Sequence, residues 1–359
     1  MRAYFDNGTT ELLSMKAKEA IAESLLTDIG LVRDNSSFGK KGIIALESCR
    51  YEIATRLDCK TGELIFTSGG TEAMNQAIYS AVSMMNELGR THILTGTMEP
   101  MVITILLNQL EALGFTVSCV MENREGNLEV SELSKFLKPE TGLLITSAVN
   151  EATGVIKPLE ELSQFSRASD LLFISDFSLL AGRIPLSLHS LDIDYAVFSA
   201  HRFGGPQGIG ILYARHGVKV TPLIQGSCEE DGRRAGSINT GLAEGMKAAL
   251  LEKTDNLEKS FQKIKELETL IKENIYETGC TLIPVESPVL PGWINFSVPG
   301  LTGEQVVKTL ERKGFILSVP PLWNGNEKPV RLLLNESNTE VEIKELLNIL
   351  YEIKRDRNN

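Results

Sequence analysis

Long apolar runs are missing from this chain of 359 residues. The first ten residues, M-R-A-Y-F-D-N-G-T-T, contain no apolar stretch of signal-peptide length, and no segment approaches the ~20 apolar residues of a membrane span. Basic residues are also fewer than acidic ones, and the formal net charge is -11. Such a chain is a poor binder of nucleic acid or anionic membranes. We therefore expect a cytoplasmic protein with neither of them as a partner.

Cysteine and histidine are scarce. The five cysteines form no C-x-x-C pair and are odd in number, which, without a secretory signal, indicates reduced thiols. They are Cys49, Cys59, Cys119, Cys228 and Cys280. The four histidines have no metal-ligand spacing, so we expect no metal site.

Short β-branched runs alternate with helix-length segments over the first ~250 residues. Expected strands are residues 63–67, 92–95, 116–120, 142–146 and 171–175, and expected helices follow residue 71 and span residues 102–113 and 158–167. Strands that alternate with helices predict a mostly parallel sheet with helices on both faces.

The pattern changes after about residue 250. Apolar residues recur at helical spacing over 257–271 and again over 343–353, and a β-rich stretch covers 293–298. These features predict a smaller α+β domain. We expect a large domain of residues 15–250 and a small domain of residues 1–14 plus 251–359.

Two short segments carry candidate ligand groups. In residues 66–75, small residues end a strand and open a helix, so Gly70 and Thr71 predict either a phosphate site or an ordinary helix cap. Asp176 follows another apolar strand, where ligands bind in α/β folds. It could instead cap the segment that follows it.

Two further segments are rich in glycine. Residues 194–213 run from a strand through a polar cluster and a Gly/Pro turn into another strand, which is typical of close backbone approach to a ligand or of a plain hairpin. Residues 226–239 are dense in charge and predict a functional loop or a solvated one.

Taken in order, these segments resemble the class V aminotransferase family, and within it the NifS-like cysteine desulfurases. The resemblance spans nearly the whole chain. It rests on residues 4–10 (Y-F-D-N-G-T-T), 67–72 (T-S-G-G-T-E), 152–154 (A-T-G), Asp176, 199–210, 233–239 and 330–332 (V-R-L). It implies the pyridoxal-phosphate (PLP) transferase fold type I, with a large, mostly parallel sheet of the seven-stranded type, a smaller α+β domain and a homodimer.

The resemblance places an arginine where the family has its cofactor lysine. The family segment S-x-H-K-x-x-G-P-x-G-x-G is S-A-H-R-F-G-G-P-Q-G-I-G here, so Arg202 stands at the Schiff-base position. A lysine can lose its proton and attack the cofactor aldehyde, whereas a guanidinium, with a pKa above ~12, stays charged and is a very poor nucleophile. Arg202 is therefore not expected to form the usual internal aldimine.

Other family positions are altered as well. Glu99 is interpreted as the replacement of the histidine that stacks on the cofactor ring, and Leu179 as the replacement of a cofactor-contacting glutamine. The family's N-N-E-x-G is N-E-A-T-G over residues 150–154, which alters one asparagine position. The loop after residues 314–318 is shortened and has no cysteine. Cys228, in the 226–239 loop, is either an ordinary thiol or one that faces the pocket.

The remaining family positions predict a ligand site. The resemblance gives cofactor-binding roles to Gly70, Thr71, Asp176, Ser199, His201 and Ser237, the last reaching across the dimer. It gives substrate-binding roles to Arg331, whose guanidinium could hold an amino-acid carboxylate, and to Asn7.

Three functions follow from these observations. The first is an active PLP-dependent aminotransferase or lyase with non-standard residues. The second, which the altered positions favour, is a degenerate homologue that binds PLP, a PLP–amino-acid adduct or another small anionic ligand non-covalently. The third is a non-catalytic interaction partner that keeps a dimeric scaffold. Fold alone does not decide among them.

Overall fold

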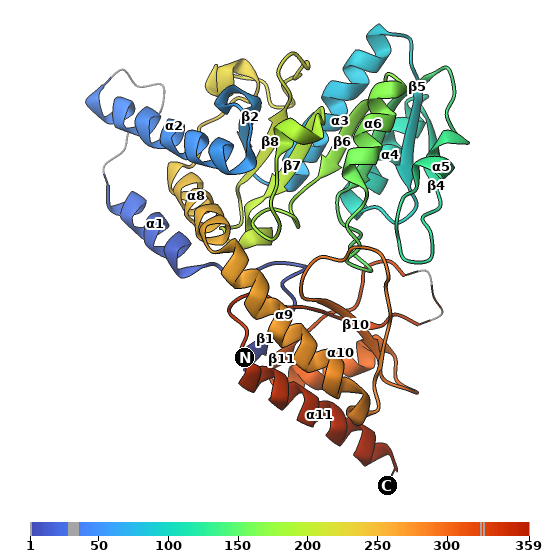
Figure 1. Cartoon of the computed structure of the whole chain (residues 1–359). Coiled ribbons are helices and arrows are strands. Elements are labelled where there is room, and N and C mark those ends of the chain that lie inside the picture. Colours follow the sequence, from blue (N-terminus) through green and yellow to red (C-terminus); the bar gives the residue numbers. More distant parts are fainter. Residues whose placement is uncertain (1, 28–35, 324, 326, 359) are drawn as a thin grey trace.

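A seven-stranded sheet forms the centre of the larger part of the molecule (Figure 1), in a computed structural model that describes residues 2–27, 36–323, 325 and 327–358. The strand order is β2-β8-β7-β6-β5-β3-β4. β8 pairs antiparallel with both β2 and β7, and the other neighbours are parallel. The strands are β2 Leu64–Thr67, β3 His92–Gly96, β4 Thr116–Val120, β5 Thr141–Ser147, β6 Leu172–Asp176, β7 Tyr195–Ser199 and β8 Gly210–Ala214.

Helices cover both faces of this sheet, as the alternating sequence pattern predicts. Along β5, Leu144 packs into one apolar core while Leu143 and Ile145 pack into the other, because successive strand side chains point to opposite faces. One core contains side chains of α3 and α4, and the other contains those of α2, α5, α6 and α8. The helices are α1 Met15–Leu26, α2 Ser37–Leu57, α3 Gly70–Glu87, α4 Met101–Ala112, α5 Val130–Ser134, α6 Leu159–Ala168, α7 Leu188–Leu191 and α8 Thr240–Asp255.

A third apolar core joins the start of the chain to its last hundred residues. Ala3 and Phe5 pack there with residues between 264 and 350, and β1 pairs in parallel with β11. α9 follows α8 almost directly and leads into this smaller part (Figure 1). Its elements are β1 Ala3–Tyr4, α9 Leu257–Asn274, β9 Thr281–Leu282, β10 Trp293–Ser297, α10 Gly303–Arg312, β11 Phe315–Ile316, β12 Val330–Leu333 and α11 Glu340–Asn358. The division of the chain at residue 250 stays a prediction.

The expected strands and helices are confirmed, with ends that shift by a few residues. The observed seven-stranded, mostly parallel sheet also confirms the expected fold class. None of the described helices combines the length and apolar character that a membrane span requires.

The charged loop of residues 226–239 is anchored to the sheet by a buried ion pair. Glu230, in a short 3-10 turn (η3, Glu229–Gly232), accepts from both terminal nitrogens of Arg50 on α2, each at 2.8 Å. The same carboxylate accepts from the backbone amide of Phe66 at 2.8 Å, and the Arg50 guanidinium lies 4.8 Å from the centre of the Phe66 ring. The two side chains are 8% and 1% exposed, so water does not screen their interaction.

The amide substitution Glu230→Gln should therefore lower the free energy of unfolding by about 3 kcal/mol, because Arg50 stays buried without its main counter-charge. The matched substitution Asp231→Asn removes a carboxylate that is 90% exposed, so its effect should stay within about 0.5 kcal/mol. Denaturant titration of both variants tests the difference. Equal stabilities would contradict the structural role of the pair.

Candidate cofactor pocket

A cavity of about 380 Å³ opens at the carboxyl ends of β6 and β7, beside the first turn of α3. Open α/β sheets bind ligands at this edge, because the loops that follow the parallel strands all begin there. Of the predicted cofactor-binding residues, the cavity brings together Gly70, Thr71, Asp176, Ser199 and His201.

The first turn of α3 forms one wall of the cavity, as the predicted phosphate site requires. Ser68, Gly69, Gly70 and Thr71 line it, and the free amides of a helix N-terminus attract an anion. A Cβ on Gly70 would lie 3.1 Å from the Cβ of Ser199, so the close approach of helix and strand favours glycine. Glu72 does not add free negative charge, because it pairs with Arg234 at 2.8 Å.

Asp176 ends β6 and lines the cavity. Its carboxylate accepts from the backbone amide of Ser178 at 2.8 Å, and no cation among the described residues lies within ion-pair distance of it. Burial raises its pKa, and the nearby Arg202 opposes that shift in part. A ligand with a protonated ring nitrogen would give this carboxylate the partner that it lacks.

Arg202 reaches the cavity from a 3-10 turn that follows β7 (η2, Ala200–Phe203). Its guanidinium donates to Glu151 Oε1 at 2.8 Å and to the backbone oxygen of Gly8. The side chains of Arg202 and Glu151 are 22% and 19% exposed. Two residues that the sequence comparison predicts to be departures from the family pattern thus form one ion pair, in which the Glu151 carboxylate balances the permanent charge of Arg202.

The two neighbours of Arg202 on the cavity wall are held by hydrogen bonds. The backbone amide of Ser199 donates to the Ser178 hydroxyl at 2.9 Å, and His201 Nδ1 lies 3.1 Å from the Thr10 hydroxyl. Burial lowers the pKa of His201, and Arg202 lowers it further. His201 therefore adds no positive charge to the cavity at neutral pH.

The sequence model of the family described as "Aminotransferase class-V" matches residues 3–320. The chain belongs to this family. It is 31% identical over 348 residues to a cysteine desulfurase IscS of Dictyoglomus turgidum, covering 95% of this chain and 86% of that protein. It is 31% identical over 377 residues to a NifS/IcsS protein homolog of Lactobacillus delbrueckii subsp. bulgaricus, covering 98% and 96%. A solved structure of a NifS-like protein superposes with a TM-score of 0.94 at 27% identity, covering 99% of this chain and all of that one.

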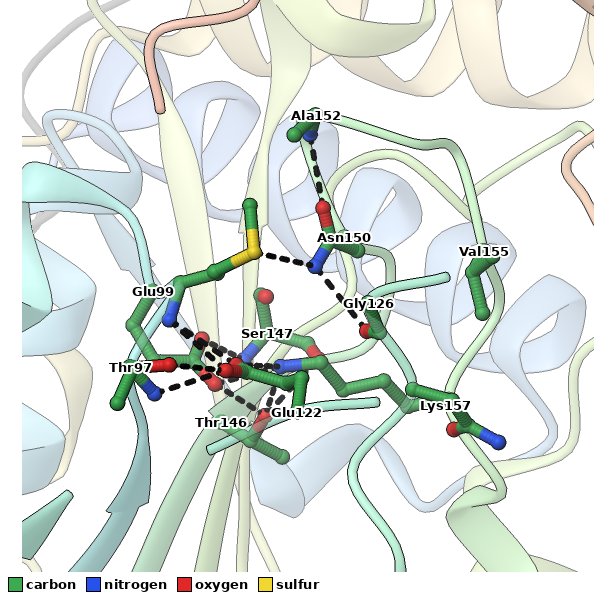
Figure 2. A network of polar contacts seen from close by, with 12 residues as sticks. Thr97, Glu99, Glu122, Gly126, Thr146, Ser147, Asn150, Ala152, Val155 and Lys157 are labelled. Carbon is green, nitrogen blue, oxygen red and sulfur yellow. Dashed lines mark hydrogen bonds and ion pairs between the residues drawn. The ribbon is translucent and has the colours of Figure 1, made fainter. Parts of the chain in front are cut away.

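Glu99, which the family resemblance predicts on the cavity wall, does not line the cavity. Figure 2 shows its carboxylate in a buried network, where it accepts from Lys157 Nζ and the Thr146 hydroxyl at 2.5 Å and from the Ser147 amide at 2.7 Å. The wall residue from this turn is Pro100, the next one along the chain. The interpretation of Glu99 as the stacking residue is therefore corrected. A turn has no periodicity that would fix which of these two neighbouring residues faces the cavity.

The same network holds a second carboxylate that the sequence reasoning missed. Glu122 accepts from the amides of Thr97 and Met98 at 3.0 Å, and it lies 3.9 Å from Lys157 Nζ (Figure 2). Lys157 and Glu122 come from loops without a recognisable motif, so only an unusually apolar context for charged residues could have indicated their burial. Together they hold the turn that presents Pro100 to the cavity.

Several other predicted residues lie outside the cavity. Leu179 packs into an apolar core, and the Asn7 amide donates to the backbone oxygen of Leu333 at 2.8 Å. Ser237 is exposed, and the exposed Cys228 lines a different cavity, beside Arg50. For Cys228, the ordinary-thiol alternative therefore agrees with the structure of the single chain.

Arg331 is buried and already satisfied by protein groups. Its guanidinium donates to the Ser318 hydroxyl at 3.0 Å, to the Glu151 backbone oxygen at 3.0 Å, and to Asp6 and Thr9 at 3.2 and 2.6 Å. It also lies 5.5 Å from the ring centre of Trp293. Only 4% of the residue is exposed, so a ligand carboxylate would have to displace these contacts.

We expect Asp176→Asn to make the ligand-free protein more stable at pH 7. The pKa of Asp176 is raised in the folded state, so its contribution to stability is present in acid and is lost as the pH rises through that raised pKa. Asparagine removes the cost of the buried charge. The gain should shrink as the pH falls through the raised pKa and should be gone below about 3.9, the ordinary aspartate pKa.

Thermal unfolding of both proteins across pH, without ligand, measures this difference. A variant that is less stable than the parent at pH 7 would show that Asp176 has a protein counter-charge, contrary to the structure.

Proposed function

We propose that this protein is a degenerate member of its family that binds a PLP-type ligand non-covalently and does not perform cysteine desulfuration. The ion pair between Arg202 and Glu151 carries the proposal. It puts a permanently protonated side chain at the predicted position of the cofactor lysine and supplies the charge partner that keeps it there.

The cavity residues suit the non-covalent part of such a ligand. The first turn of α3, with Gly70 and Thr71, would hold the phosphate, and Asp176 would pair with the protonated pyridine nitrogen. When bound, PLP supplies an electron sink for reactions at amino-acid carbons. The covalent part does not fit, because none of the described residues that line the cavity is a lysine.

The same lining argues against the active-enzyme alternative. None of the described residues that line the cavity is a cysteine, so no thiol is in place to accept sulfur from a substrate. Arg331, the predicted holder of an amino-acid carboxylate, already donates to Ser318, Asp6, Thr9 and the Glu151 backbone. A reaction that needs a lysine, a thiol and a free arginine in the cavity would lose several orders of magnitude in rate.

We further infer a cytoplasmic homodimer. Ser237 supports the dimer: it is exposed and lies outside the cavity of its own chain, as expected of a residue that reaches a partner's cofactor. The acidic net charge of -11 and the lack of long apolar runs support the location. No single observation favours the third alternative, a purely structural partner.

Spectroscopy with PLP and borohydride tests the proposal. The wild-type protein should give colour that dialyses away and should retain no label after borohydride reduction. Arg202→Lys should produce a visible band that borohydride fixes to the protein, because lysine can attack the aldehyde.

Arg167→Lys is the matched control, since Arg167 pairs with Asp192 and Asp194 away from the cavity. It should behave as the wild type does. A wild-type protein that borohydride labels at a lysine would overturn the proposal and restore the active-enzyme alternative.

A further inference from the structure

We propose that an apolar groove beside α6 is a docking site for a segment of a partner protein in which basic residues flank an apolar side chain. The groove shares no lining residue with the cofactor pocket, so the inference goes beyond the proposed function and does not rest on it. Three features of the groove carry the proposal: its apolar floor, its length and the carboxylates on its rim.

The floor of the groove is an apolar surface that the chain covers only in part. The hollow has a volume of about 690 Å³, and it is lined by the start of α6 and by residues 184–187 and 190–191, among others. Ile156, Ile184, Leu186 and Leu191 line it, pack against the core that contains side chains of α2, α6 and α8, and remain partly exposed. Exposed apolar surface with a polar rim is typical of protein contact sites.

The groove is longer than a small molecule requires. A second hollow of about 590 Å³ lies next to the first along α6, and the two share Glu160, Ser190 and Leu191. The second hollow adds the polar residues Ser163 and Gln164 to the lining. Together the two hollows are larger than most small-molecule pockets. An apolar part followed by a more polar part suits a stretch of polypeptide with one apolar anchor.

The rim of the first hollow carries three exposed carboxylates. They are Asp58 at the end of α2 and Glu160 and Glu161 in the first turn of α6. None of the three is in an ion pair with another described residue. Among the described residues of this lining only Lys157 is basic, and its ammonium is buried in the ion pair with Glu99. The rim therefore presents negative charge without a compensating cation.

Asp58 is unfavourable for the helix that it ends. It is the C-cap of α2 with a φ of 50°, a left-handed conformation that favours glycine or asparagine, and its charge lies at the negative end of the helix dipole. Its carboxylate accepts from the hydroxyl of Ser187, which lines the same hollow. Helix formation therefore does not account for a carboxylate at this position, whereas a basic partner would.

The charge of the rim selects the kind of partner. A second copy of the chain would on average bring further negative charge, since its net charge is -11, and like charges oppose association across an interface. An acidic partner is disfavoured for the same reason. A segment with lysine or arginine beside an apolar side chain would fit both the floor and the rim.

Fluorescence polarisation with labelled hexapeptides tests the proposal. The probes are Lys-Lys-Leu-Phe-Lys-Lys, the acidic Glu-Glu-Leu-Phe-Glu-Glu, the neutral Gln-Gln-Leu-Phe-Gln-Gln and the anchorless Lys-Lys-Ser-Ser-Lys-Lys. We expect the basic apolar peptide to bind the wild type about tenfold more tightly than the acidic or the anchorless one, because each of these lacks one of the two complementary features. Added salt should weaken the basic apolar peptide more than the neutral one, because it screens exposed charges.

Substitutions on the rim locate the binding site. The double variant Glu160→Gln, Glu161→Gln should bind the basic apolar peptide about fivefold more weakly and the neutral peptide unchanged. The matched control is Glu258→Gln, Glu304→Gln, which removes two exposed carboxylates from the first turns of α9 and α10. It should keep the wild-type affinity within about twofold.

Asp58→Asn separates docking from a structural role. Asparagine suits the left-handed cap better and removes the charge at the negative end of α2, so the variant should unfold at a higher temperature than the wild type. It should also bind the basic apolar peptide about twofold more weakly. A carboxylate kept for the fold alone would show the opposite change in stability.

The outcomes decide the proposal in either direction. Failure of the basic apolar peptide to bind, equal binding of the acidic peptide, or unchanged affinity in the Glu160, Glu161 double variant would overturn it. A wild-type dimer that the same double variant dissociates would assign the groove to a second copy instead. PLP binding is measured separately, so none of these results bears on the proposed function.

Discussion

The permanent charge of Arg202 is the constraint around which the pocket is arranged. A guanidinium at the end of a strand, inside a partly enclosed cavity, needs an acceptor because it cannot shed its proton. Glu151 and the backbone of Gly8 provide that acceptor set. Glu151 is itself held by Arg331 through its backbone oxygen, so the pair is tied to the smaller part of the molecule. One side-chain identity thus affects three segments that are distant in sequence.

Charge elsewhere around the cavity is used to build its walls. Glu99, Glu122 and Lys157 are buried together and hold the turn that carries Pro100. Arg50 and Glu230 anchor the charged loop to α2 and the edge of the sheet. Buried ion pairs of this kind contribute little net stability, but removing one partner strongly destabilises the fold because it leaves the other charge buried and unpaired. The exception is Asp176, which is desolvated and has no cation within ion-pair distance among the described residues, as the proposed ligand site requires.

Much of the fold follows from local pattern. The alternation of apolar β-branched runs with helices predicts the parallel sheet, because a strand that is buried on both faces, as β5 is, has an apolar run at its centre. The glycines at residues 69–70 and Asp176 predict a ligand edge because strand ends and helix starts meet there. The site was harder to predict where one residue of register matters. Glu99 and Pro100 are adjacent, yet one is buried in a charge network and the other lines the cavity.

The sequence by itself determined the family and the layered α/β fold, since these depend on residue type and order along the chain, and it predicts that Arg202 stands at the position of the cofactor lysine. Only the tertiary structure decided that Arg202 pairs with Glu151, that Arg331 is already satisfied and that Asp176 is not. The physical reason is that ion pairing depends on distances of a few ångströms between segments such as residues 8, 151, 202 and 331. No periodicity along the chain encodes those distances.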